Sequence, residues 1–82
     1  MPSYFTEHAR ARMQQRGIPA AAVEALLDYG RSVPAGRGCE LLFFDKAVRK
    51  AAPVPRAYAV VGRDGLVVTV GHRFRRVPRG RP

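Results

Sequence analysis

The dipeptide Asp64-Gly65, which lies between two short apolar runs, constrains the fold of this chain more than any other feature. Asp-Gly between apolar segments is a strong signal for a β-hairpin, so residues 56–61 and 66–74 are predicted to be its strands. A two-residue or a four-residue turn gives the same two faces, whereas a three-residue turn would exchange them. With a two-residue turn, one face carries the pairs Val61–Val68, Ala59–Val70 and Ala57–His72, and the other carries Val60–Thr69, Tyr58–Gly71 and Arg56–Arg73.

The two faces of this hairpin differ in chemistry. The first is small and apolar, so we expect it to lie beneath helices, with His72 at its end. A histidine on an apolar face is more typical of a residue satisfied by a backbone group than of a catalyst. The second face sets Tyr58 and Thr69 among Arg56 and Arg73, a combination that can stack a base and hold phosphates. The alternative for this second face is an ordinary solvated surface.

The remaining turn signals divide the chain before the hairpin. Residues 31–35 predict a short edge strand that Pro34 limits, and the GRG turn at 36–38 follows. Residues 39–45 (CELLFFD) predict a buried strand. Residues 46–55 predict a basic, proline-marked loop.

Two helices are predicted ahead of the strands. Thr6 is a suitable N-cap for a helix over residues 7–16, and Gly17 can end that helix with a positive φ. Pro19 suits the first turn of a second helix, which Gly30 closes. The periodic apolar positions of the second helix are Val23, Leu26 and Leu27. The predicted fold class is therefore α+β, with an N-terminal αα-hairpin packed on one face of a three- to four-stranded antiparallel sheet.

The length of 82 residues predicts one domain. We expect residues 1–74 to form it and residues 75–82 to be a basic, flexible tail. Neither a membrane-spanning run nor a secretory signal is recognisable, and the single Cys39 allows no internal disulfide. These features predict a cytoplasmic protein without a membrane partner.

Positive charge dominates the composition. Fifteen Lys and Arg against six Asp and Glu give a net charge of +9, and thirteen of the fifteen are arginine. Such an excess predicts a polyanionic partner: nucleic acid, an acidic protein or a membrane surface. The preference for arginine over lysine carries less weight, because a GC-rich genome produces it as well.

The first helix concentrates part of this charge. His8, Arg12 and Arg16 fall within one sector of roughly 80°. The neighbouring sector, which should face the sheet, holds Phe5, Ala9 and Met13. The three polar side chains therefore line the border of the buried face, where they can be held in place and still reach a ligand. The alternative is a solvated shoulder whose arginines form salt bridges with Glu24 and Asp28.

The pattern H-A-x-x-R-x-x-x-R-G-I, which begins at His8 and ends at Ile18, resembles the opening of a widespread bacterial family of domains of unknown function. The resemblance continues through PAAAVEALLDYG and YAVVGRDGLVVTV and so covers nearly the whole chain. That family is similar to the RelE and BrnT toxin group. The similarity implies a compact fold of two helices and a sheet, RNA cleavage with or without the ribosome, and a neutralising antitoxin as a partner. It also implies cleavage residues among basic and aromatic side chains of the sheet and C-terminal segment, the zone of Tyr58, Arg56 and Arg73.

RNA can be cut without a metal when its 2′-hydroxyl attacks the adjacent phosphate, which requires a proton acceptor, a proton donor and cations. Four residues are predicted to be catalytic: His8 as base or acid, Arg12 and Arg73 as phosphate ligands, and Tyr58 as a stacking group or proton donor. The predicted RNA-binding residues are Arg16, Arg56, Thr69, His72, Arg75 and Arg76. The predicted function is a metal-independent endoribonuclease of the RelE/BrnT type.

Other chemistries are less favoured. Two histidines and one cysteine show no metal-ligand spacing, so neither a metal nor another cofactor is predicted. Cys39 at the start of an apolar strand is more typical of an inert cysteine than of a nucleophile. Two alternatives to the nuclease remain: a non-catalytic RNA- or ribosome-binding module on the same fold, and a protein-interaction domain that uses an apolar strand edge.

Overall fold

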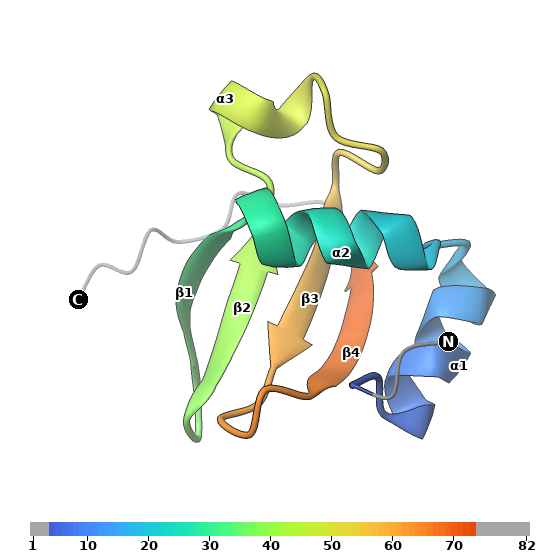
Figure 1. The fold of residues 1–82 in the computed structure, drawn as a ribbon, viewed down its shortest axis with the longest axis vertical. Coiled ribbons are helices and arrows are strands. Elements are labelled where there is room, and N and C mark those ends of the chain that lie inside the picture. Colours follow the sequence, from blue (N-terminus) through green and yellow to red (C-terminus); the bar gives the residue numbers. More distant parts are fainter. Residues whose placement is uncertain (1–3, 74–82) are drawn as a thin grey trace.

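A four-stranded antiparallel sheet, in the order β1-β2-β3-β4, lies at the centre of the computed structural model, which describes residues 4–73 (Figure 1). Two helices precede the sheet, and a short helix lies between its second and third strands. The predicted α+β class and the order of its main elements are thus confirmed. The elements are α1 (Glu7–Arg16), α2 (Ala20–Tyr29), β1 (Arg31–Gly36), β2 (Cys39–Phe43), α3 (Lys46–Arg49), β3 (Ala57–Val61) and β4 (Val67–His72).

Local capping chemistry determines where α1 begins and ends. The hydroxyl of Thr6 accepts a hydrogen bond from the backbone N–H of Ala9 at 3.0 Å. Gly17 takes a φ of 64°, and its N–H donates to the carbonyl of Met13. Both predicted ends are confirmed. Pro19 is the N-cap of α2, one position before the predicted first turn.

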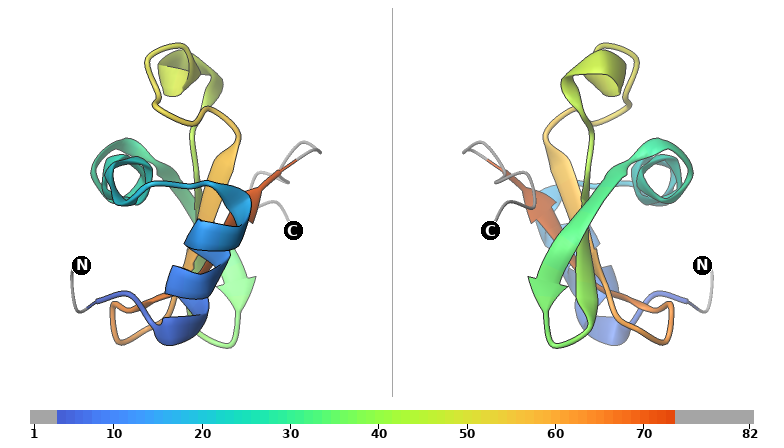
Figure 2. Two further views of the ribbon diagram at one scale, coloured as in Figure 1. Left: turned by 90° about the vertical axis from the view of Figure 1, so that its right-hand side faces the viewer. Right: turned by 90° about the vertical axis from the view of Figure 1, so that its left-hand side faces the viewer.

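The two main helices occupy different positions on the sheet. Helix α2 crosses one face, whereas α1 lies alongside the outer edge of β4 (Figures 1 and 2). The chain just before α1 pairs with β4, because Val67 N–H donates to Tyr4 O at 2.8 Å and Thr6 N–H donates to Val67 O at 3.1 Å. The prediction that both helices pack on one face is therefore wrong for α1. The physical reason is that this backbone pairing fixes the start of α1 at the edge strand and satisfies polar groups there.

The core lies between α2, α1 and the first face of the hairpin. Ala57 and Ala59 are fully buried on that face, and such small side chains allow the helix to approach closely. The prediction that Leu27 belongs to the core is wrong, since 42% of its surface is exposed. The buried side of α2 consists of Ala22, Val23 and Leu26, and Leu27 lies at its border.

The hairpin keeps its predicted faces but not its predicted turn. Ala57–His72, Tyr58–Gly71, Ala59–Val70 and Val60–Thr69 pair as expected. Val61 pairs with Val67 instead of Val68, so the predicted Val61–Val68 pair is wrong. The turn leaves three residues, 63–65, between Gly62 and Leu66, whose N–H and carbonyl are hydrogen-bonded at 2.9 Å, and one extra residue in β4 restores the predicted faces beyond it. Val68 is left as the extra residue of a bulge, and Val67 is buried in the core.

The segment predicted as the loop 46–55 contains α3, so that prediction is wrong for its first half. Asp45 is the N-cap, and its Oδ1 accepts a hydrogen bond from Lys46 N–H at 2.7 Å. Phe44, with 1% of its surface exposed, anchors the chain between β2 and α3 in the core. A cap and a buried anchor stabilise a helix that is too short to form by itself.

Within residues 4–73, no helix has the length and apolar character needed to cross a membrane. The domain boundary predicted at residue 74 and the tail at 75–82 lie outside the described residues.

Candidate functional site

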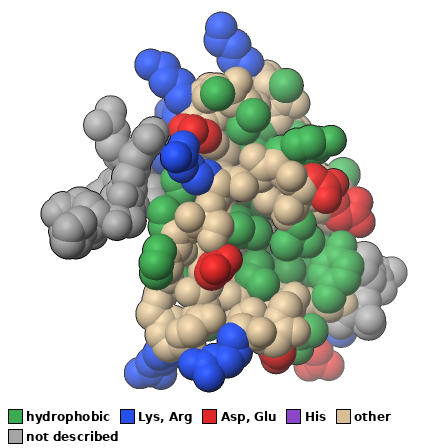
Figure 3. Space-filling model, turned by 60° about the vertical axis from the view of Figure 1, so that its left-hand side comes forward, with side chains coloured by type: hydrophobic (Ala, Val, Ile, Leu, Met, Phe, Trp, Pro, Cys, Tyr) green, Lys and Arg blue, Asp and Glu red, His purple; other side chains and the backbone are tan. Residues whose placement is uncertain are grey.

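Basic side chains gather at the end of the sheet where β3 begins and β4 ends. Arg73 follows β4, and its backbone N–H donates to the carbonyl of Arg56 at 2.8 Å, so the two arginines lie next to each other. Arg49, the last residue of α3, is close enough for its charge to act on Arg73. We call Arg49, Arg56 and Arg73 the arginine cluster. Figure 3 shows Lys and Arg side chains at this end of the molecule, and others at the opposite end of the sheet.

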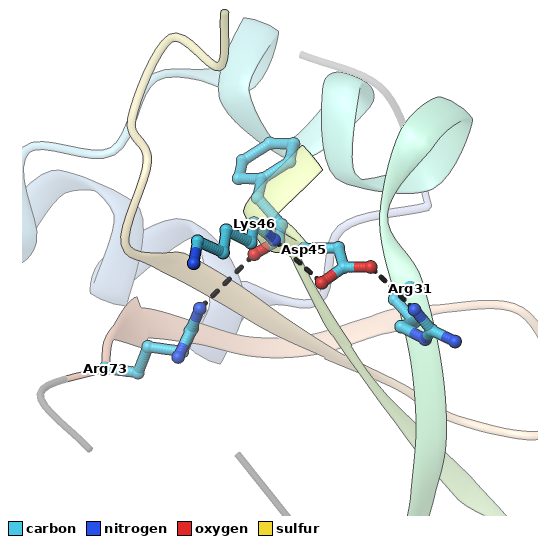
Figure 4. A network of polar contacts seen from close by, with 5 residues as sticks. Arg31, Asp45, Lys46 and Arg73 are labelled. Carbon is cyan, nitrogen blue, oxygen red and sulfur yellow. Dashed lines mark hydrogen bonds and ion pairs between the residues drawn. The ribbon is translucent and has the colours of Figure 1, made fainter. Parts of the chain in front are cut away.

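The guanidinium of Arg73 is held by contacts on β2 and the residue after it. Its central carbon lies 5.2 Å from the centre of the Phe43 ring, a cation–π contact. Its Nη2 donates to the carbonyl of Phe44 at 3.3 Å (Figure 4). Partial burial lowers the pKa of Arg73, and the positive charges of Arg49 and Arg56 lower it further, against the opposing effect of Asp45. The cluster therefore concentrates like charges around a cation that is fixed in place.

The carboxylate of Asp45 has structural partners of its own. Its Oδ2 lies 2.6 Å from Nη1 of Arg31 in β1, and its Oδ1 caps α3 (Figure 4). Within residues 4–73, neither Arg49 nor Arg56 forms an ion pair, and the buried Nε of Arg49 lacks a hydrogen-bond acceptor. Two cations of the cluster thus carry charge that no carboxylate of the described chain neutralises.

Aromatic side chains lie next to the cluster on the second face of the sheet, the face opposite α2. Tyr58 alternates with the buried Ala57 and Ala59, so its side chain points to this second face. Its ring covers Gly71, where an added Cβ would lie 2.8 Å from the Tyr58 hydroxyl oxygen. Phe43 pairs with Tyr58 across β2 and β3. Thr69 points to the same face of β4 and is half-buried.

The predicted site residues of α1 form a separate group at the edge of the sheet. Nε of Arg12 donates to Nε2 of His8 at 3.4 Å, a long hydrogen bond between exposed side chains. Arg12 also donates from Nη1 to Gln15 Oε1 at 3.0 Å. Neither Arg12 nor Arg16 forms the alternative salt bridges to α2 within the described residues.

His72 has a structural contact. Its Nε2 lies 2.8 Å from the backbone carbonyl of Arg16, so the imidazole joins the end of β4 to the end of α1. This contact is the backbone bond expected for a histidine at the edge of an apolar face. The side chain of Arg16 is exposed. The predicted RNA-binding residues Arg75 and Arg76 lie outside the described residues.

The sequence analysis missed the side chains of α3. Lys46, Arg49 and Lys50 line a shallow hollow of about 330 Å³ together with Pro55. The sequence does contain a pattern that predicts this helix: an Asp N-cap followed by cations at i, i+3 and i+4, which is typical of a helix with one basic side. Pro53 and Pro55 in the same segment favour a loop and so obscure this pattern.

No group of three or more His, Cys, Asp or Glu side chains within residues 4–73 is arranged to hold a metal ion. The hollow beside α3 contains no residue of α1 or β4. His8 and Arg12 therefore lie outside the hollow that Arg49 helps to line.

One family model, described as "Domain of unknown function (DUF4258)", matches residues 5–72. The match extends from Phe5, which bridges to β4, to His72, the last residue of β4, and so includes every element of the fold. No curated protein and no solved structure shows significant similarity to the chain.

Proposed function

Because the chain belongs to the DUF4258 family, a domain of unknown function, we propose a role from the geometry of its own residues: it binds single-stranded RNA. The observation that carries this proposal is the convergence of Arg49, Arg56 and Arg73 from three segments of the chain. In the proposed complex the arginine cluster holds phosphates, and the second face of the sheet receives bases.

The charge of the cluster favours a bound polyanion. Burial is the main cause of the lowered pKa of Arg73, and the positive charges of Arg49 and Arg56 lower it further, so bringing these three guanidinium groups together costs free energy. A phosphate placed among them offsets that repulsion and accepts charge-assisted hydrogen bonds. A planar guanidinium can donate two such bonds at once to the phosphate oxygens. The net charge of +9 adds a long-range attraction for such a ligand.

The aromatic neighbours favour a single-stranded ligand. Unpaired bases stack on aromatic rings and on guanidinium planes, whereas the bases of a duplex are already stacked. The Tyr58 ring lies against Gly71 on the second face, where an unpaired base could contact it. Phe43, the cross-strand partner of Tyr58, holds the guanidinium of Arg73 in a cation–π contact.

Fluorescence anisotropy with a labelled single-stranded RNA, measured over a series of salt concentrations, tests the proposal. We expect Arg56→Gln to weaken binding and to reduce the slope of log K against log salt by about 0.7, the effect of one lost phosphate contact. Arg37→Gln is the matched control, because it removes the same charge in the turn at the other end of the sheet. The absence of binding at about 50 mM salt would overturn the proposal. An equal loss with Arg37→Gln would overturn it as well.

The second candidate function is metal-independent RNA cleavage of the RelE/BrnT type, and the contact between His8 and Arg12 favours it. Nε of Arg12 lies 3.4 Å from Nε2 of His8, so a cation and an imidazole are neighbours on α1. These are the two kinds of group, an acid–base side chain and a cation, that attack by a 2′-hydroxyl on a phosphate requires. RNA bound at the arginine cluster would have to extend around β4 to reach His8.

Incubation of labelled RNA with the protein and a chelator, with and without ribosomes, tests the second candidate. We expect cleavage that His8→Ala abolishes and that Gln14→Ala, a control on the exposed side of α1, leaves intact. Binding without cleavage would leave the first proposal and exclude the second. Cleavage that His8→Ala does not change would remove His8 from the mechanism.

A further inference from the structure

An apolar groove separates the C-terminal half of α2 from α3. Its volume is about 470 Å³, within the range of roughly 300–1,000 Å³ that ligand pockets occupy. Ala25 and Tyr29 of α2 form one side, and Ala47, Val48 and Ala51 form the other. Phe44 lies at its floor and is almost fully buried. We call this feature the α2–α3 groove.

The groove lacks the groups that would orient a small ligand. Small-molecule sites combine apolar walls with a few converging polar groups. Here the Tyr29 hydroxyl is the one polar side-chain group among the lining residues. Tyr29 is 71% exposed, and exposed tyrosines are enriched at protein interfaces. The lining therefore fits apolar side chains presented by another protein.

The charge beside the groove specifies that protein further. One side of α3 faces the groove, and the other carries Lys46, Arg49 and Lys50. Within residues 4–73 none of these three cations pairs with a carboxylate. An occupant with apolar side chains on one face and carboxylates on its border would complement both sides of α3.

We propose that the α2–α3 groove binds an amphipathic, acidic helix of a partner protein. The apolar face of that helix enters between α2 and α3, and its carboxylates pair with Lys46 and Lys50. A groove bounded by two helices favours a helix over an added strand, which would need an unpaired sheet edge. This interaction uses Ala47 of α3 and Ala51 just after it, which have no part in the proposed RNA contacts.

A synthetic peptide of about 14 residues, or four helical turns, serves as the probe. It carries leucines at i, i+4, i+7 and i+11, glutamates at the bordering positions and a fluorophore. A second peptide has lysine in place of each glutamate, and a third has the composition of the first in scrambled order. Fluorescence anisotropy with the full chain should show binding of the first peptide and at least about tenfold weaker binding of the other two.

Variants of the chain then locate the binding site. Ala47→Gln combined with Ala51→Gln places two amides over the groove and should weaken binding of the acidic peptide by about tenfold or more. Ala11→Gln combined with Ala21→Gln, at exposed positions of α1 and α2, is the matched control and should leave binding unchanged. Lys50→Gln should weaken binding and flatten its salt dependence. Far-UV circular dichroism and the thermal midpoint establish that each variant is folded.

Equal binding of the acidic and basic peptides would overturn the proposal, as would acidic-peptide binding that the groove variant leaves unchanged. If the groove variant loses RNA affinity but binds the acidic peptide normally, the groove belongs to the RNA surface and the proposal is also wrong. RNA affinity that stays normal while peptide binding is lost supports it.

Discussion

The ring of Tyr58 covers the backbone of Gly71, so closely that a Cβ on residue 71 would lie 2.8 Å from the Tyr58 hydroxyl oxygen and 2.9 Å from its ring carbons. The two residues are cross-strand partners on β3 and β4. The backbone of Gly71 lies outside the left-handed region, so its conformation does not require glycine. Glycine is required here because a Cβ would clash with the Tyr58 ring. This pair holds the aromatic ring of the second face against the sheet.

Gly71→Ala should displace the Tyr58 ring and lower the free energy of unfolding by about 1–3 kcal/mol, the usual cost of overpacking. Urea denaturation measures this change. The control is a double-mutant cycle with Tyr58→Ala, in which the added methyl group should cost much less because the ring is gone. An unchanged cost in the Tyr58→Ala background would show that the ring does not confine residue 71.

Arg73→Lys should weaken RNA binding although the net charge is unchanged. Lysine keeps the charge but loses the planar contact with Phe43 and the fixed hydrogen bond to Phe44 O. Stability should also fall by about 0.5–1 kcal/mol, the size of a cation–π contact near the surface. Anisotropy and urea denaturation measure the two effects, and Arg37→Lys at the other end of the sheet is the control. If Arg73→Lys binds RNA as the parent does, charge alone accounts for the role of Arg73.

His72→Ala should lower the free energy of unfolding by about 0.5–1.5 kcal/mol, because the carbonyl of Arg16 loses its hydrogen-bond donor. His72→Gln, which retains a donor, should recover part of this loss. Urea denaturation of the three proteins, together with RNA binding, separates a structural role from a functional one. A loss of RNA affinity without a loss of stability would favour the predicted RNA-binding role of His72 over the backbone contact.

The pKa of Tyr4 gives a prediction for alkaline pH. Burial raises this pKa above its ordinary value of 10.0, and the negative charges of Glu24 and Asp28 raise it further. The folded state therefore favours neutral Tyr4. The resulting stability is present below pH 10 and is lost as the pH rises through the raised pKa.

Tyr4→Phe should remove this part of the alkaline loss in urea denaturation measured as a function of pH. Tyr29→Phe is the control, since Tyr29 is 71% exposed. Glu24→Gln should bring the pKa of Tyr4 closer to 10.0 in a spectrophotometric titration. A Tyr4→Phe variant with the alkaline profile of the parent would contradict the prediction.

The fold could be predicted from the sequence where neighbouring residues decide the structure. The hydroxyl of Thr6 and the left-handed Gly17 mark the ends of α1, because capping involves groups within one helical turn. The faces of the hairpin followed from alternation along β3 and β4, which also placed Tyr58 on the second face and Ala59 in the core. For the same reason Arg56 and Arg73 were predicted to be neighbours, and their backbones are hydrogen-bonded.

The tertiary structure alone decided the features that join distant segments. The pairing of Tyr4 and Thr6 with Val67 holds α1 at the sheet edge, and no pattern within either segment indicates the partner. Arg49 joins Arg56 and Arg73 because the buried Phe44 turns the chain into α3 above them. Local hydrogen bonds and side-chain alternation are encoded over a few residues. Convergence of side chains depends instead on how the whole core packs, which is a property of many residues at once.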